Sequence, residues 1–459
     1  MIICRAQGNL CAVFTEVLIM QTALKVGFGR EKITPTMEVY ISGGGNPKRL
    51  STGILDDLYI TCVAITDSAD NTVLVFTEDM QQVSSPFIDP GVEGVVAATG
   101  VPQDKIIIAA THTHSAPGQH LGRHGIKEFQ EIYTNGMIQA AVAAMEDRTP
   151  ATVSVGSTHA KGLVFVRHYL LENGTYAGSA YGDFKSAPIK QQAYEGKDIV
   201  QLIRFDRVGK RAVLLMNLGV HGTFNGNIKL TNISADFPGP TREHIEANSD
   251  CLVAYFMSAA GDQVPRSLHE PINHGLEYIG YGQKLGQYVL DALAYMEQAH
   301  TGELQLQRWT LTAKANKNDM DRLPQAEEVY DAFLEGSYKL ANPLVKQYGF
   351  VSPYEARAIC IHSKQGETRD VQLAALSFGD IAMTFGAFEM FGDTGVDIRE
   401  KSPYPFTFVV SQSMATNDYI PAPIGFKLRC YEAYSSHYAP GTAERITEEY
   451  VRVLNEMKS

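Results

Sequence analysis

The segment IIIAATHTHSAPGQH, residues 106–120, decides the fold of this chain. Three isoleucines and two alanines lead into Thr-His-Thr-His, and the run then breaks at Ser-Ala-Pro-Gly. A short apolar run that ends in a turn is typical of a strand buried on both faces. Ligands of α/β proteins bind at the carboxyl ends of such strands. The segment therefore predicts a buried strand that delivers two histidines into a crevice.

Further apolar, β-branched runs predict five more buried strands, at residues 58–66, 71–79, 198–205, 211–220 and 251–257. Segments with helical spacing lie among and after them, at residues 128–148, 276–299 and 325–340. This alternation predicts an α/β fold in which a central sheet is covered by helices on both faces. No linker divides the chain, and the polar stretch 314–328 is interpreted as an insertion, so a single large domain is expected.

The charge balance excludes one class of partner. The chain has 459 residues and a formal net charge of −12, with no basic block of the kind that follows a phosphate backbone. No nucleic acid partner is therefore expected, and homo-oligomeric assembly is left open. No apolar run reaches the roughly 18 residues of a membrane-spanning helix, so no stable membrane association is expected either.

The six cysteines are scattered and form no Cys-x-x-Cys pair. This spacing suggests neither a zinc ribbon nor a dense disulfide framework, and reduced thiols in a cytoplasmic protein are the plainer interpretation. Residues 1–22 are interpreted as a poorly ordered leader or an over-extended start, because no basic region or cleavage site flanks their apolar stretch. The folded domain is expected to comprise residues 23–459.

Histidines supply the first candidate metal ligands. His112 and His114 are two residues apart, which places both side chains on one side of an extended backbone. His221 follows the predicted strand 211–220, so a second strand end offers an imidazole to the same crevice. Imidazoles that converge suit a divalent metal such as zinc. The alternative is a hydrogen-bonded core histidine beside a turn residue.

Two carboxylates stand in comparable places. Glu389 lies in TFGAFEMFGDTG (384–395), an apolar setting that is costly for a charge unless a cation binds it. A glutamate at a helix N-terminus is the alternative. Asp262 lies in AAGDQVPR (259–266), where a turn aspartate that accepts backbone hydrogen bonds is the alternative to a catalytic role.

The polar loop GQHLGRHG (118–125) carries His120, Arg123 and His124. These side chains predict binding of a polar small-molecule substrate, such as a carbohydrate derivative or an N-acyl amino compound. A solvated turn would have the same composition.

Several segments, taken in order, resemble the N-terminal catalytic domain of the neutral/alkaline ceramidases, zinc-dependent amidases that hydrolyse the N-acyl bond of ceramide. The specific element is THTHSAPG. The other similar segments are VGFGREKITP (26–35), DDLYITCVAI (56–65), GLVFVRHY (162–169), VHGT (220–223), SADFPG (234–239), NDYIPAP (417–423) and CYEAYSSHY (430–438).

The resemblance implies a mixed α/β fold and a site with one zinc ion per chain. Its implied zinc ligands are His112, His221, Glu389 and Tyr419. It also implies that His114 handles protons, that Tyr431 stabilises an oxyanion and that Arg167 lines the substrate pocket.

Two departures from the family change the expected function. Ceramidases carry Asn-x-Gly-Asp-Val-Ser-Pro-Asn, whose serine is assigned as the nucleophile or active-site hydroxyl, and Val264 stands at that serine's place. Valine can neither attack a carbonyl nor share a proton, and neither nearby serine, Ser258 or Ser267, is expected to replace it. Full ceramidases also continue into an immunoglobulin-like domain, and the resemblance does not extend to such a domain.

The sequence therefore predicts a zinc hydrolase that cleaves an amide or ester bond of a small, polar substrate through a metal-activated water. In this hypothesis His114 or Asp262 accepts a proton, and Tyr431 and Arg167 stabilise the oxyanion. The alternative is a metal- or ligand-binding protein without catalysis.

Overall fold

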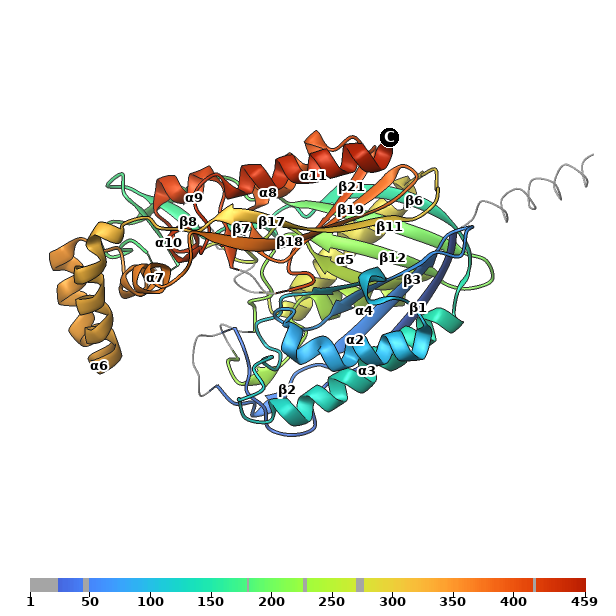
Figure 1. Ribbon diagram of the computed structural model, residues 1–459, viewed down its shortest axis with the longest axis horizontal. Helices are drawn as coiled ribbons and strands as arrows, with labels where there is room; N and C mark the ends of the chain where they lie inside the picture. Colours follow the sequence, from blue (N-terminus) through green and yellow to red (C-terminus); the bar gives the residue numbers. More distant parts are fainter. Residues whose placement is uncertain (1–23, 44–48, 180, 226–228, 270–275, 416–417) are drawn as a thin grey trace, which may run out of the picture.

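A nine-stranded mixed sheet runs through the centre of the molecule (Figure 1). The computed structural model describes residues 24–43, 49–179, 181–225, 229–269, 276–415 and 418–459, so the predicted leader 1–22 lies outside the described residues. The strand order is β14-β12-β11-β6-β1-β3-β4-β5, with β16 paired beside β6. Neighbours are antiparallel except for the β12–β14 and β4–β5 pairs.

All six predicted strands are present, with ends that differ by no more than two residues. The strands of this sheet are β1 (Leu24–Lys32), β3 (Tyr59–Thr66), β4 (Thr72–Glu78), β5 (Ile106–Ala110), β6 (Thr149–His159), β11 (Ile199–Arg207), β12 (Ala212–Leu218), β14 (Cys251–Met257) and β16 (Glu297–Gln298).

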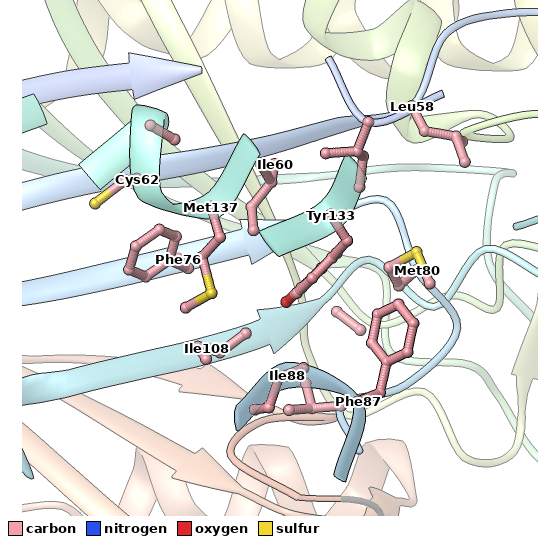
Figure 2. Close-up of a cluster of buried hydrophobic side chains, with 14 of the residues drawn as sticks. Leu58, Ile60, Cys62, Phe76, Met80, Phe87, Ile88, Ile108, Tyr133 and Met137 are labelled. Carbon is pink, nitrogen blue, oxygen red and sulfur yellow. The ribbon is translucent and has the colours of Figure 1, made fainter. Parts of the chain in front are cut away.

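Four helices cover one face of the sheet. They are α2 (Ser85–Thr99), α3 (Ile126–Glu146), α4 (Pro238–Asn248) and α5 (Tyr278–Ala292). Figure 2 shows part of the apolar cluster beneath α2 and α3, where Phe87 and Tyr133 meet Ile60, Phe76 and Ile108 of the strands. The predicted helix 276–299 ends earlier, at Ala292, and its last residues form a short turn and β16.

The other face carries a second sheet, where helices had been expected. Its order is β17 (Gln305–Lys314), β18 (Thr368–Phe378), β19 (Ile381–Gly386) and β21 (Phe406–Val410), and α8 (Gly392–Lys401) and α11 (Thr442–Lys458) cover its outer side. The isoleucine run explains the difference. Ile106 and Ile108 pack toward the helices and Ile107 packs toward the second sheet. A strand buried on both faces has the same sequence pattern whichever element covers it.

A helical arm extends from the second sheet (Figure 1). It consists of α6 (Leu323–Tyr348), which is interrupted at Gly336 and Ser337, and α7 (Pro353–Ser363). The arm has an apolar cluster of its own. It lies between β17 and β18, whose adjoining ends pair at Lys314 and Thr368, so the stretch predicted as an insertion does begin one. Among the described residues, no helix is both long and apolar enough to cross a membrane.

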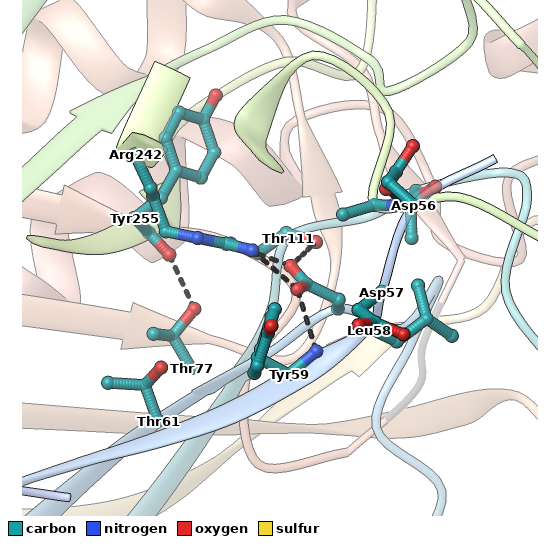
Figure 3. A network of polar contacts seen from close by, with 12 residues as sticks. Asp56, Asp57, Leu58, Tyr59, Thr61, Thr77, Thr111, Arg242 and Tyr255 are labelled. Carbon is teal, nitrogen blue, oxygen red and sulfur yellow. Dashed lines mark hydrogen bonds and ion pairs between the residues drawn. The ribbon is translucent and has the colours of Figure 1, made fainter. Parts of the chain in front are cut away.

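A buried ion pair fixes the strand ends that lead to the histidines (Figure 3). Arg242 of α4 donates Nη1 to Asp79 Oδ1 at 2.7 Å and Nη2 to Oδ2 at 2.6 Å. The same carboxylate accepts the backbone N–H of Tyr59 at 2.9 Å and the hydroxyl of Thr111 at 3.3 Å. One charge pair therefore joins α4 to the adjoining ends of β3, β4 and β5.

Candidate metal centre

His112 occupies a tight turn directly after β5. The strand ends at Ala110, and the His112 N–H donates to the Met80 carbonyl at 2.9 Å. His112 has a φ of 62°, in the left-handed region. The prediction of histidines at a strand end is confirmed, but the explanation by the two-residue strand repeat is wrong, because the backbone here is not extended.

The turns that carry His112 and His221 are joined directly. Thr113 and Gly222 form a parallel bridge, and the His114 N–H donates to the Gly222 carbonyl at 2.9 Å. The ring centroids of His112 and His221 are 4.8 Å apart, as are those of His112 and His114. Gly222 permits this approach, since a Cβ there would lie 3.0 Å from both the His112 oxygen and the Thr113 Cα.

Backbone carbonyls orient all three rings. The Nδ1 atoms of His112, His114 and His221 lie 2.6, 2.8 and 2.8 Å from the carbonyl oxygens of Gln81, Gly43 and Ala260. A carbonyl only accepts hydrogen bonds, so each Nδ1 is the protonated nitrogen. The Nε2 atoms are therefore the ones left to bind a ligand, and a metal-ligating histidine characteristically has such a carbonyl partner.

Glu389 brings a negative charge to the same point. Its Oε2 lies 3.0 Å from His221 Nε2 and 3.6 Å from His112 Nε2. Burial alone would raise the pKa of this carboxyl, but His112, His221 and Arg167 hold it below its ordinary value. The carboxylate is therefore ionised. Glu389 precedes the first residue of α8 by three positions and points at the histidines, so it is not a glutamate that merely stabilises a helix terminus.

Tyr419 lies beside Glu389 on a paired strand. Strands β20 (Glu389–Met390) and β22 (Tyr419–Ile420) run parallel, with Glu389 opposite Tyr419. Arg167 donates Nη2 to the Tyr419 oxygen at 3.1 Å and to the Gly261 carbonyl at 2.7 Å. The rings of Tyr419 and Tyr431 are 5.8 Å apart, so the structure brings Arg167 and both tyrosines together.

Glu432 is a member of the site that sequence reasoning missed. Its side chain is fully buried, and its Oε1 accepts Arg167 Nε at 2.5 Å. Burial raises the pKa of the Glu432 carboxyl, but Arg167 and His168 lower it more, so the net shift is downward. The signal was available: a glutamate inside CYEAYSSHY is expensive to bury unless a cation pairs with it.

The nitrogen and oxygen atoms that converge here have a spacing that suits a tetrahedral metal ion. Zinc–nitrogen and zinc–oxygen bonds of about 2.0–2.1 Å in a tetrahedron place two donors about 3.3 Å apart. Here the Glu389 oxygen lies 3.0 and 3.6 Å from His221 Nε2 and His112 Nε2, and the Nε2 atoms of His112 and His114 are 3.1 Å apart. Burial lowers the pKa of His112 to about 4 and that of His114 well below its ordinary value. Neutral imidazoles that face each other with lone pairs fit a bound cation.

Asp262 forms its side-chain hydrogen bonds with groups other than these donors. Its carboxylate accepts the Gly392 N–H at 2.9 Å and the Tyr194 hydroxyl at 3.0 Å. Burial raises the pKa of Asp262 to about 6. These contacts place its side chain at the start of α8, where it joins chain segments.

The loop residues predicted to bind substrate are exposed. His120, Arg123 and His124 all lie on the surface. The Arg123 guanidinium lies 5.2 Å from the Tyr40 ring, and His124 pairs with Glu38 at 3.2 Å. None of the three is among the described residues that line the cavity next to the histidines.

That cavity has a volume of about 1060 Å³. From the predicted site it is lined by His114, Arg167, Tyr419 and Tyr431, and Val264 lines it too. Neither Ser258 nor Ser267 is among its described lining residues, and both are buried. The remaining described lining comes from several loops, from β8 (His168–Leu171) and from the arm: Gly43, Tyr169, Ser179, Phe184, Thr223, Phe224, Pro265, Arg266, Leu268, Tyr330, Phe333, Leu334, Tyr354 and Arg357.

Solved structures show which class of fold this is. The chain has the α/β fold of ceramidases, and the predicted resemblance is confirmed at the level of the fold. One similar structure is a ceramidase complexed with C2, with a TM-score of 0.68 and 15% identity over 95% of this chain and 75% of that chain. Another is the neutral ceramidase from Pseudomonas aeruginosa, with a TM-score of 0.68 and 19% identity over 94% of this chain and 74% of that chain. No family model and no curated protein matches the sequence.

Proposed function

We propose that this chain is a zinc-dependent hydrolase that cleaves an amide or ester bond of a small-molecule substrate. The observation that carries the proposal is the convergence of the Nε2 atoms of His112 and His221 with Glu389 Oε2, at distances suited to one bound ion. We assign His112, His221, Glu389 and Tyr419 as the residues that would hold it, and a water would then be its fifth ligand, a coordination number that catalytic zinc can adopt. When bound, zinc supplies a Lewis acid and lowers the pKa of a water ligand to about 7.

The residues around the ion have separate roles in this proposal. Burial raises the pKa of Tyr431 to about 12, so its hydroxyl stays protonated at neutral pH and donates a hydrogen bond to the substrate carbonyl oxygen. Arg167 stays positively charged and orients Tyr419. His114 lines the cavity and its Nε2 lies 3.1 Å from His112 Nε2, so we assign it to take a proton from the attacking water and pass it to the leaving group.

The lack of a serine at position 264 is compatible with this chemistry. Val264 lines the cavity where ceramidases carry a hydroxyl, so no side chain at this position forms a covalent intermediate. Hydrolysis then proceeds by a single addition of water, without a covalent acyl-enzyme. Water bonds to the acyl carbon, the carbon–nitrogen or carbon–oxygen bond breaks, and the leaving group departs with a proton.

A binding protein without catalysis is the competing function, and Val264 favours it. Against it stands the cavity, which reaches Tyr431 and His114 and is much larger than a structural ion needs. Structural zinc sites are closed and consist of cysteine and histidine ligands, whereas a catalytic site keeps one position open.

Metal content tests the proposal first. We expect mass spectrometry of protein without a histidine tag to find about one zinc per chain, and to find it lost in His112→Ala and Glu389→Ala. Val264→Ser is the matched control, because it changes the cavity lining without removing a donor, and it should retain the metal.

Turnover separates the two functions. A panel of p-nitrophenyl esters and aryl amides is assayed with and without a chelator. Chelator-sensitive hydrolysis that His112→Ala abolishes supports the enzyme. A bound zinc without any turnover favours the binding protein, and full zinc occupancy in His112→Ala would refute the ligand assignment.

A further inference from the structure

The cavity next to the metal centre is basic although the protein is acidic. Its described lining contains three arginines, Arg167, Arg266 and Arg357, and no aspartate or glutamate. The whole chain has a formal net charge of −12. A concave site lined by one sign of charge concentrates ligands of the opposite sign. The lining charge therefore selects for an anion.

Arg167 is already committed to other groups. Its Nε binds Glu432, and its Nη2 binds the Gly261 carbonyl and Tyr419. The charge available to a ligand is therefore that of the other two arginines.

Arg266 lines the cavity and forms no ion pair among the described residues. Its Cζ lies 4.1 Å from the centroid of the Phe224 ring, and its Nη2 donates to the Leu276 carbonyl at 3.1 Å. Its Nε is buried without a hydrogen-bond partner, and no ion pair reaches it within the described part of the chain. Two carboxylates, those of Asp236 and Glu277, act on it from further away, and Asp236 accepts the backbone N–H groups of Asn225 and Phe237. A planar guanidinium supported by a ring is suited to bidentate binding of a carboxylate.

Arg357 adds a second cation from the arm. It is exposed on α7 and lines the same cavity as Tyr354, one turn earlier on the helix. Asp418 is near enough to interact with its charge, but that carboxylate pairs with His437 at 3.2 Å. Within the described residues Arg357 has no carboxylate partner of its own.

The rest of the wall is apolar and aromatic. Tyr169, Phe184, Tyr330, Phe333 and Tyr354 line it, and the rings of Phe333 and Tyr354 are 5.6 Å apart. Such a surface packs against an acyl chain or an aromatic group. The cavity thus combines the metal centre, two available cations and an apolar wall.

We propose that the substrate is an amide that carries a carboxylate, as an N-acyl amino acid does, with the carboxylate bound by Arg266 and Arg357 and the apolar part packed against the arm. This inference rests on the proposed hydrolase function, which it makes more specific. In the reaction water adds to the acyl carbon, the carbon–nitrogen bond breaks, and the products are a carboxylate and an amine that takes the proton.

Binding can be tested without turnover. N-acetylphenylalanine and N-octanoylphenylalanine, each beside its uncharged carboxamide, are titrated by calorimetry into protein from which a chelator has removed the metal, so that no hydrolysis contributes to the heat. We expect the carboxylates to bind at least about tenfold more tightly than the carboxamides, because a charge-assisted hydrogen bond is worth that factor or more. Succinyl anilide and its carboxamide form a second arm, which tells whether the carboxylate belongs to the amine part or to the acyl part.

Substitutions then assign the preference to residues. In Arg266→Gln and in Arg357→Gln the preference for carboxylate should fall severalfold, and in the double variant it should disappear. Arg266→Lys keeps the positive charge but loses the planar guanidinium that can bind a carboxylate with two hydrogen bonds, so it should retain part of the preference for carboxylate. Arg452→Gln is the control, since Arg452 is exposed on α11 and pairs only with Glu449 and Glu456 within the described residues.

The outcomes separate this inference from the proposed function. Equal binding of carboxylate and carboxamide, binding of neither, or a preference that survives in the double variant overturns the anionic substrate. If p-nitrophenyl acetate is hydrolysed in a chelator-sensitive manner at the same time, the hydrolase stands. A carboxylate preference that depends on Arg266, in a protein that turns over nothing, supports the anion site and overturns hydrolysis.

Discussion

Glu78 is a buried carboxyl at the end of β4, one residue before the Asp79 ion pair. It is fully buried and interacts with the Tyr133 hydroxyl and with Gln119 Nε2, which donates at 3.3 Å. Burial raises the pKa of Glu78 to about 8, although both hydrogen bonds oppose the shift. The folded protein therefore holds a proton here at neutral pH that the unfolded chain releases.

The raised pKa of Glu78 makes stability depend on pH. The contribution is fully present below the unfolded pKa of about 4.5 and is lost as the pH rises through about 8, because the folded state binds the extra proton in between. We expect the free energy of unfolding of the wild type to fall, relative to that of Glu78→Gln, by about 1.4 kcal/mol per pH unit at most over this range. Urea unfolding of both proteins at pH 5, 6.5 and 8 measures the difference, and a constant difference would contradict the prediction.

Some residues of the site could be predicted from the sequence, and others could not. His112, His221 and Glu389 could be proposed from their chemistry alone, since each is a costly polar residue beside an apolar run. Tyr419 came only from the resemblance, because tyrosine is not a usual zinc ligand. The carbonyls that orient the histidines belong to residues 43, 81 and 260, far apart in the chain, and no local pattern reveals such contacts.

At the scale of elements, the site depends on how closely two turns approach. A methyl group at Gly222 would lie 3.0 Å from the His112 oxygen and the Thr113 Cα, so Gly222→Ala must move the turns apart by a few tenths of an ångström. We expect zinc affinity to fall about tenfold to a hundredfold, as with other changes behind metal ligands. Competition with a chelator of known affinity measures it. Gly122→Ala, on the exposed loop where a methyl group meets nothing, should leave the affinity unchanged.

The Asp79–Arg242 pair joins α4 to the strand ends, so its loss should destabilise the whole fold. Arg242→Met leaves the buried Asp79 carboxylate without its counter-charge, and we expect a loss of about 3–5 kcal/mol in the free energy of unfolding. Urea denaturation measures it. The exposed Arg452→Met should change the free energy of unfolding by less than about 1 kcal/mol. An equal loss in both variants would show that the Asp79–Arg242 pair stabilises the fold no more than an exposed ion pair does.

At the scale of the molecule, sequence patterns predicted the large sheet and missed the second one. Its inner strands β18 and β19 are apolar and form a hairpin in which Phe378 pairs with Ile381, but no local pattern shows that this hairpin covers the large sheet. The arm interrupts β17 and β18 with more than fifty residues between their paired ends, which hides the hairpin from any local pattern.

The same insertion yields the last prediction. The Ala315 N–H donates to the Glu367 carbonyl at 2.9 Å, so an Asn-Gly turn can connect these residues in place of 316–366. No proposed metal ligand lies in the deleted segment, and we expect the shortened protein to bind about one zinc per chain and to unfold cooperatively. It should be less stable, because the ion pair between Arg429 and Glu355 and the hydrogen bond between Ser352 and Tyr434 are lost.

The deletion should weaken ligand binding although it leaves metal binding intact. The deletion removes Arg357 and three aromatic residues of the apolar wall, Tyr330, Phe333 and Tyr354. Both compounds lose the contact with Arg357, but N-octanoylphenylalanine also loses packing for its acyl chain, so its affinity should fall about tenfold more than that of N-acetylphenylalanine. Phe333→Ser in the full-length chain should show a smaller loss in the same direction. Calorimetry measures both. Loss of zinc from the shortened protein would mean that the arm supports the metal centre itself, whereas undiminished binding of the octanoyl compound would remove the arm from the substrate site.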